Sequence, residues 1–263
     1  MTFANAFATR AEGDLFVAGV PEGWSQGRAT FGGLVLAQTL AATRQRLDEP
    51  RPCRAIAASF PAPVGPGPVT IEARALRHGR AVSHLHAELR QGDAIGCVAL
   101  LSFGAARPSA VDVPPPPRPE IAPPEDLPTL ANPLAPPPVF TKFFDYRLAF
   151  GDRPYSGSSS TEMGGWCRFR DEPGPLGEEH VLALVDAWPS PAVARFAAPA
   201  PAASMTWAIE LLPVEDAIDG GGWWLYHASL EAAGGGYAHS AARLWSPGGR
   251  LAALSRQAVA IFG

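Results

Sequence analysis

Residues 178–196, EEHVLALVDAWPSPAVARF, form an apolar stretch that carries a single carboxylate, Asp186, beyond its two opening acids. Glu178 and Glu179 stand where the N-terminus of a helix favours negative charge. From Val181 onward apolar residues recur at roughly helical spacing, so the stretch predicts a helix with Asp186 in its middle. A bare carboxylate beside an apolar stripe is costly unless it is hydrogen-bonded or takes part in chemistry.

A second interpretation of Asp186 is structural. Aspartate is a good N-cap and proline suits the first turn of a helix, so Asp186 could cap a new turn over residues 187–189. The stretch alone leaves both interpretations open.

Composition bounds the class of protein. The chain has 263 residues, of which 47% are hydrophobic, enough for one large or two ordinary globular domains. The net charge is −4 and lysines and arginines form no run, which argues against a nucleic-acid partner or a basic membrane-binding patch. The N-terminal residues lack an export signal and no stretch approaches the roughly 18 apolar residues of a membrane span. We therefore expect a cytoplasmic protein with no membrane partner.

The three cysteines, Cys53, Cys97 and Cys167, are far apart and have no metal-binding spacing, as expected of reduced thiols in a cytoplasm. His84 and His86 lie two apart in one expected strand, but no third ligand has convincing spacing, so no metal is expected.

Two parts of the chain share one order of elements. The run 33–47 is rich in Ala, Leu, Gln and Arg and predicts a helix, which four strand-like runs follow: 55–60, 69–77, 82–90 and 94–104. In the second part, strand-like runs 140–150 and 163–172 precede the helical stretch, and four more follow it: 203–212, 221–232, 237–246 and 250–262.

Between the two parts, residues 107–138 contain 13 of the 29 prolines. Such a segment favours an extended conformation and predicts a linker. The expected organisation is therefore an N-terminal repeat at 1–106, a proline-rich linker at 107–138 and a C-terminal repeat at 139–263.

The shared order indicates a tandem duplication of a helix laid along an antiparallel sheet. Two such α+β units can join their sheets edge to edge, which removes free strand edges. The first helix carries Gln38 and Thr39 in its middle and no carboxylate, so of the two helices only the second carries an acid beyond its first turn.

These residues resemble a known family, the acyl-CoA thioesterase II (TesB-like) type with a double hotdog fold. ATFGGLVLAQTLAA at 29–42 is similar to the family's first helix entry, and the run at 59–103 to the strands that follow it. LALVDAWPSP at 182–191, ASMTWAIELLP at 203–213 and LAALSRQAVAIF at 251–262 are similar to its C-terminal repeat. The resemblance covers nearly the whole chain and implies two tandem repeats that form one continuous sheet.

In that family an Asp on the second helix, a Thr or Ser on the next strand and a Gln on the last strand hold a water. The resemblance places these roles on Asp186, Ser204 and Gln257. The acid that commonly follows the hydroxyl is replaced by Thr206, and a frequent histidine farther along this strand falls at Glu210. Because Thr206 and Glu210 differ from the family pattern, the resemblance does not fix the substrate preference or the activity.

Thioester hydrolysis needs a positioned water and donors aimed at the developing oxyanion. Ser204 and Thr206 lie two apart on an expected strand and so face one side, which makes Thr206 the substitute hydroxyl. Backbone N–H groups at Gly32 and Gly33 are candidate oxyanion donors, because glycine allows close approach of a carbonyl. The structural alternatives are a tight helix entry for the glycines and a solvated edge position for Gln257.

The sequence therefore predicts an acyl-CoA thioesterase that needs no cofactor, has acyl-CoA as its substrate and forms a homo-oligomer through exposed sheet faces. One alternative is an acyl-CoA-binding or scaffold protein that keeps the fold after catalysis has decayed. A hotdog hydratase is disfavoured because it needs a paired Asp and His, and His180 is the one histidine near Asp186 in the sequence.

Overall fold

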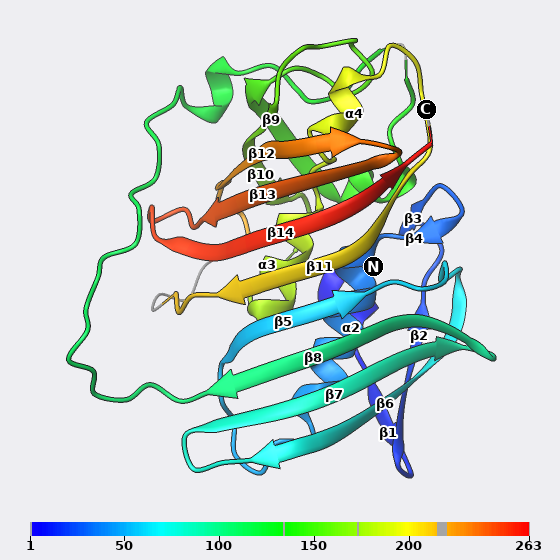
Figure 1. The fold of residues 1–263 in the computed structure, drawn as a ribbon, viewed down its shortest axis with the longest axis vertical. Helices are drawn as coiled ribbons and strands as arrows, with labels where there is room; N and C mark the ends of the chain where they lie inside the picture. The colour runs from blue at the N-terminus through cyan, green and yellow to red at the C-terminus, as the bar shows by residue number, and fades with distance from the viewer. Residues whose placement is uncertain (1, 134, 173, 215–219, 263) are drawn as a thin grey trace.

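One antiparallel sheet of twelve strands runs through the computed structural model, which describes residues 2–133, 135–172, 174–214 and 220–262 (Figure 1). The order of the strands is β1-β2-β6-β7-β8-β5 in the first half and β11-β14-β13-β12-β10-β9 in the second. The first-half strands are β1 Arg10–Glu12, β2 Leu15–Val20, β5 Cys53–Ser59, β6 Gly67–His78, β7 Val82–Gln91 and β8 Ala94–Gly104. The second-half strands are β9 Phe144–Gly151, β10 Glu162–Phe169, β11 Ala202–Leu211, β12 Trp224–Gly234, β13 Tyr237–Trp245 and β14 Leu251–Ile261.

The two halves join through β5 and β11. These strands pair antiparallel, with Ala57 opposite Ala208 and Ser59 opposite Thr206. Each half contributes to the large sheet two strands before its long helix and four after it, so the predicted helix-then-four-strands order and the edge-to-edge joining of the sheets are confirmed. The architecture is a double hotdog fold.

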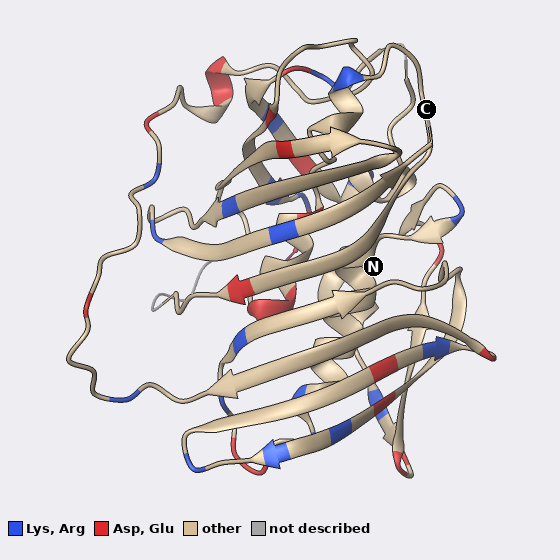
Figure 2. Ribbon diagram, in the orientation of Figure 1, with Lys and Arg blue, Asp and Glu red and all other residues tan. Residues whose placement is uncertain are grey.

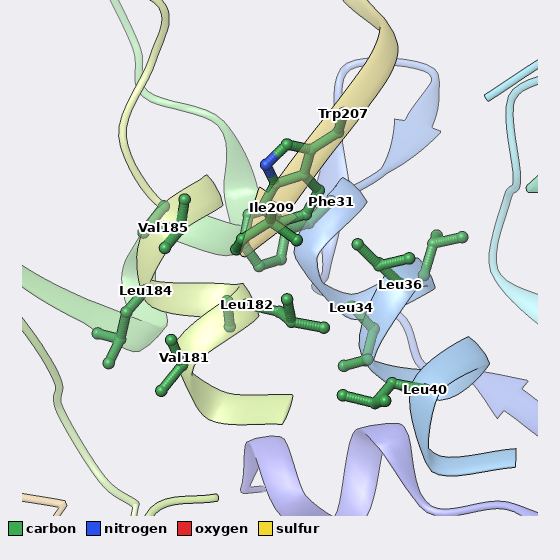
Figure 3. Packing of buried hydrophobic residues seen from close by; sticks show 14 of the residues in the cluster. Phe31, Leu34, Leu36, Leu40, Val181, Leu182, Leu184, Val185, Trp207 and Ile209 are labelled. Atoms are coloured by element: carbon green, nitrogen blue, oxygen red, sulfur yellow. The ribbon is translucent and has the colours of Figure 1, made fainter. Parts of the chain in front are cut away.

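Helices α2 Gly32–Arg44 and α3 Glu178–Asp186 pack against each other at the concave side of the sheet (Figures 1 and 3). Figure 3 shows Leu182 pointing from α3 toward α2, where Leu34 and Leu40 lie. A Cβ on Gly33 would lie 3.0 Å from the Ala183 Cα, so glycine is needed for this close approach.

The sheet below α2 is lined by small residues. Ala58, Ala99, Ala87 and Ala73 stand opposite one another on β5, β8, β7 and β6, and all four are buried. Such a row lets the helix lie close to the strands, so α2 is buried on nearly all sides.

The stretch 178–196 differs from the continuous helix that its sequence predicts. The helix α3 ends at Asp186, and a separate short helix, α4 Ala192–Arg195, follows after a break. Pro189 and Pro191 explain the break, because proline has no N–H and disfavours helical conformation in the residue before it. Asp186 is therefore the last residue of its helix and does not lie mid-helix.

The opposite ends of the two helices are tied by charge. Arg44 at the end of α2 contacts Glu178 at 2.6 Å and Glu179 at 3.1 Å, at the acidic start of α3 (Figure 2). The Glu178 carboxylate also accepts a hydrogen bond from the Cys53 backbone at 3.0 Å. Elsewhere charges of both signs are scattered over strands and loops.

The first 30 residues fold into several short elements. They form α1 Phe3–Phe7, the strands β1 and β2, and a small ribbon of β3 Ser25–Gln26 with β4 Ala29–Thr30. Glu172 accepts a hydrogen bond from the Ala4 backbone at 2.9 Å, and the Gln38 amide donates to the Ala6 carbonyl at 2.9 Å. Partners so distant in sequence leave no local signal.

The proline-rich segment takes the extended path that its composition predicts, with one 3₁₀ turn, η1 Pro124–Asp126, inside it and another, η2 Val139–Phe143, after it. It is fixed to the outer face of the second half: the indole of Trp166 donates to the Ala122 carbonyl at 2.9 Å and that of Trp245 to the Pro116 carbonyl at 3.2 Å. The exact boundaries at 106 and 139 stay a prediction.

Candidate active site

Asp186 lies where the C-terminal end of α3 meets the N-terminal end of α2. Its Oδ2 accepts a hydrogen bond from the Gly33 backbone N–H at 2.7 Å. The first N–H groups of a helix lack internal partners and carry partial positive charge, and the N-cap residue of α2, Phe31, offers no side-chain acceptor. The carboxylate of one repeat thus caps the helix of the other, and the suggested capping of a new turn at 187–189 is not seen.

Gln257 holds the other carboxylate oxygen. Its Nε2 donates to Asp186 Oδ1 at 2.9 Å, and its strand, β14, lies inside the sheet between β11 and β13. The edge-strand alternative for Gln257 is therefore wrong. Two of the predicted residues, Asp186 and Gln257, meet although 71 positions separate them.

Burial raises the pKa of Asp186 from 3.8 to about 6, while the hydrogen bonds from Gln257 and Gly33 act in the opposite direction. The carboxylate is therefore mostly ionised at neutral pH, yet basic enough to accept a proton from a bound water.

Aromatic residues make up much of the apolar surroundings. The Tyr146 hydroxyl donates to the Ala187 carbonyl at 3.1 Å, and Trp188 stacks on Tyr226 with ring centroids 5.7 Å apart. Burial, followed by the charges of Cys167 and Asp186, raises the pKa of Tyr146, so its phenol stays protonated. Sequence reasoning missed both tyrosines, since the strand pattern marks them only as inward-facing residues.

Ser204 and Thr206 do not face the same side as predicted. A bulge in β11 places Ser204 opposite Val259 and Thr206 opposite Ala258, two neighbours that point to opposite faces of β14. Ser204 shares the inner face with Gln257, whereas Thr206 is exposed on the outer face. Thr206 is therefore excluded as a substitute hydroxyl. Among the described residues, no hydrogen bond joins Ser204 to Asp186 or Gln257.

Gly32 and Gly33 have different positions at the start of α2. The Gly33 N–H is occupied by Asp186, whereas the Gly32 N–H has no acceptor within the described part of the chain. A Cβ on Gly32 would lie 3.0 Å from Asp186 Oδ2. The space next to the carboxylate is thus open only because residue 32 has no side chain.

Other chemistry-bearing residues lie outside this constellation. The three cysteines are buried and unpaired, and burial raises the pKa of Cys97 and Cys167 to about 12, so these two thiols stay protonated. His180 contacts Glu172 at 3.3 Å, away from Asp186 at the other end of α3. The described residues contain no cluster of three metal-binding side chains, and none of the described helices is long and apolar enough to span a membrane.

The double hotdog fold and a carboxylate held between its two helices define a class of thioester-processing proteins. Residues 20–104 match the family model of the acyl-CoA thioesterase N-terminal domain, and residues 124–261 match that of the C-terminal domain. The chain belongs to the acyl-CoA thioesterase family and is a thioester hydrolase.

Solved structures agree in fold. A hot-dog-fold protein of Alicyclobacillus acidocaldarius is 25% identical with a TM-score of 0.88, covering 99% of this chain and 98% of its own. The acyl-CoA thioesterase II TesB2 of Mycobacterium marinum is 19% identical with a TM-score of 0.77, covering 100% and 99%. The tesB protein of Mycobacterium avium subsp. paratuberculosis is 19% identical with a TM-score of 0.79, covering 99% and 98%. Comparison with curated proteins gives no match.

Proposed function

We propose that the protein hydrolyses an acyl-CoA thioester to the free acid and CoA by means of a water held by Asp186, Gln257 and Ser204. The observation that carries this proposal is the Asp186 carboxylate, fixed through one oxygen by Gln257 and through the other by Gly33. A carboxylate fixed at both oxygens cannot rotate away, and its remaining lone pairs can accept from a water.

In the proposed reaction the water oxygen attacks the thioester carbonyl carbon while Asp186 takes one of its protons. The C–O bond forms and the carbonyl electrons move to the oxygen. The tetrahedral oxyanion then collapses, the C–S bond breaks and the departing CoA sulfur takes the proton from Asp186. Every atom comes from water and thioester, so the reaction needs no cofactor.

The Gly32 N–H is the proposed oxyanion donor. It stands at the positive end of α2, beside the carboxylate, and has no acceptor in the described residues. A backbone donor aimed at developing charge lowers the barrier without reorganisation. Gly33, by contrast, serves this site through Asp186.

The alternative of a decayed acyl-CoA-binding protein rests on Thr206 and Glu210. Both are exposed and face the outer side of β11, away from Asp186. The departures that suggested decay thus leave the inner constellation intact, which favours the enzyme. We also propose a cytoplasmic location, which suits three unpaired thiols, and a homo-oligomer in solution.

The test is release of free thiol from a panel of aliphatic and aromatic acyl-CoA substrates, with Asp186→Ala as the comparison. We expect turnover of at least one substrate and a loss of at least about a hundredfold in Asp186→Ala. No release from any substrate, combined with tight acyl-CoA binding in calorimetry, would establish the binding-protein alternative.

A further inference from the structure

Ser240 is the inward-facing neighbour of Gln257 on the next strand. The register of β13 with β14 places Ser240 directly opposite Gln257, and that of β11 with β14 places Trp207 on its other side. Side chains directly opposite each other in an antiparallel pair have Cβ atoms about 5 Å apart. A serine hydroxyl and a glutamine amide at this spacing can both contact one water.

The position of α3 supports this site. The helix that carries Asp186 packs on β13 and β14, the strands of Ser240 and Gln257. Ser204 stands on β11 and pairs with Val259, one inward position farther along β14 than Gln257. Ser240 is thus closer in register to Gln257 than Ser204 is.

The inward-facing neighbours of Ser240 on its own strand offer no side-chain hydrogen bond to its hydroxyl. The other inward residues of β13 are Ala238, Ala242 and Leu244, all buried and apolar. Ser240 is only 9% exposed, and its hydroxyl has no hydrogen-bond partner among the residues that the structure describes. The Ser240 Oγ is not sealed from solvent, so a water or a substrate atom can reach it and form the hydrogen bond that the protein does not supply.

Ser255 shows the contrast on the neighbouring strand. It lies two residues before Gln257, is also buried and inward-facing, and its hydroxyl accepts the Trp207 indole N–H at 2.8 Å. Ser255 is satisfied within the protein, whereas Ser240 is not. On this face, a hydroxyl without a protein partner therefore lies beside Gln257.

We propose that Ser240 is a catalytic residue whose hydroxyl holds the attacking water together with Gln257 and Asp186. This inference rests on the proposed function and adds a hydroxyl from β13 to the one expected from β11. Thr206, which the sequence offered as a substitute for Ser204, faces the outer side of β11, whereas Ser240 lies on the inner face beside Gln257.

The test compares kcat and KM for the best acyl-CoA substrate in Ser240→Ala, Ser240→Cys and Ser240→Thr proteins. We expect kcat to fall about tenfold in the alanine and cysteine variants, with KM nearly unchanged, and to recover in the threonine variant, which keeps a hydroxyl. The pH at which activity rises should stay the same, because Asp186 keeps its environment. Cysteine, with nearly the volume of serine and a weak donor, carries the test if the alanine protein does not fold.

Ser229→Ala is the matched control, since Ser229 is an exposed hydroxyl on the outer face of β12 and should leave kcat unchanged. Wild-type kcat in folded Ser240→Ala, beside an inactive Asp186→Asn, overturns the role of Ser240 and leaves the proposed function standing. Equal losses in all three Ser240 variants would show a structural role and also overturn it. Full activity in Asp186→Asn would instead refute the proposed function.

Discussion

Asp186 receives one hydrogen bond from each half of the molecule. Gly33 belongs to the first repeat and Gln257 to the second, so the carboxylate adopts this geometry only when the halves are joined. The N-terminus of α2 stabilises the ionised form of Asp186, whereas burial destabilises it. The pKa is raised to about 6, so burial is the larger effect.

The raised pKa predicts the pH dependence of turnover. Asp186 must be ionised to accept a proton, so kcat/KM should rise with pH along a limb with an apparent pKa near 6 and level off above pH 7. Initial rates of thiol release across pH 5 to 8 check this limb. Asp186→Asn should have at most about a hundredth of the activity, and its residual rate should lack the limb. A limb near pH 4 would mean that the acid is solvated.

The same shift predicts how stability depends on pH. The folded pKa of Asp186, about 6, lies above its ordinary value of 3.8, so between these values the folded state binds more protons than the unfolded state. Proton binding by Asp186 therefore adds up to about 3 kcal/mol to the free energy of unfolding. This stabilisation is fully present below about pH 4 and is lost as pH rises through about 6.

Asp186→Asn isolates this contribution. The asparagine amide does not ionise and can still accept from Gly33 and, after a flip of the Gln257 amide, donate to it. Denaturant titrations should show the variant more stable than the wild type at pH 8 and nearly equal to it at pH 4. A variant that is less stable at pH 8 would show that the ionised carboxylate is a net stabiliser.

Among the elements, the N-terminus of α2 was predicted from the sequence, and the structure adds the separate roles of its two glycines. The FGG entry marked the helix start, but the two glycines have separate tasks: Gly33 allows α2 to approach Ala183, and Gly32 leaves room for the Asp186 carboxylate. A Gly33→Ala variant would disturb the helix packing as well as the site, so Gly32 is the sharper probe.

Gly32→Ala should lower kcat about tenfold or more, because its methyl group would lie 3.0 Å from Asp186 Oδ2 and displace the carboxylate. Stability should change little, since alanine favours a helix. Steady-state kinetics and thermal melting measure the two effects. Gly234→Ala is the control: a Cβ there meets no atom within 4 Å, and its kcat should equal the wild-type value. Wild-type kcat in Gly32→Ala would contradict the placement of the reacting atoms beside residue 32.

The strands after each helix follow from alternation and turn chemistry, and their expected bounds agree closely with the structure. The bulge in β11 could not be predicted from the sequence, because Ser204, Met205 and Thr206 include no glycine or proline that would signal it. One extra residue reversed the facing of Thr206. The break of the 178–196 helix carried a signal in Pro189 and Pro191, which the apolar spacing outweighed in the prediction.

In the whole molecule, the proline-rich segment packs against one end of the outer face of the second half. Trp166, Leu225, Trp245 and Leu251 form a buried cluster on that face, with Ile121 of the segment against it. The sequence predicted a linker, and its attachment to the second half depends on Trp166 and Trp245, which lie far away along the chain. Composition therefore predicts the extended conformation of the segment but not the residues that it contacts.

Trp166→Phe should loosen the segment without affecting the active site. Phenylalanine keeps the apolar packing but loses the hydrogen bond to the Ala122 carbonyl and weakens the stacking of Arg118, which lies 5.1 Å above the ring. Cleavage by a glutamate-specific protease after Glu120 should become several-fold faster at unchanged kcat. Trp223 packs against the same cluster but donates no hydrogen bond to the segment, so Trp223→Phe should leave the cleavage rate unchanged. Equal rates in Trp166→Phe and the wild type would show that this contact does not hold the segment.

In the proposed reaction, a water held by Asp186 attacks the thioester directly, and the acyl group forms no covalent bond with the protein. Single-turnover hydrolysis of an acyl-CoA in ¹⁸O-labelled water, followed by mass spectrometry of the acid and of the peptide containing Asp186, tests it most directly. We predict one labelled oxygen in the released acid and none in the protein. Label in the Asp186 side chain together with an unlabelled acid would instead reveal a covalent anhydride and rule out direct attack by water.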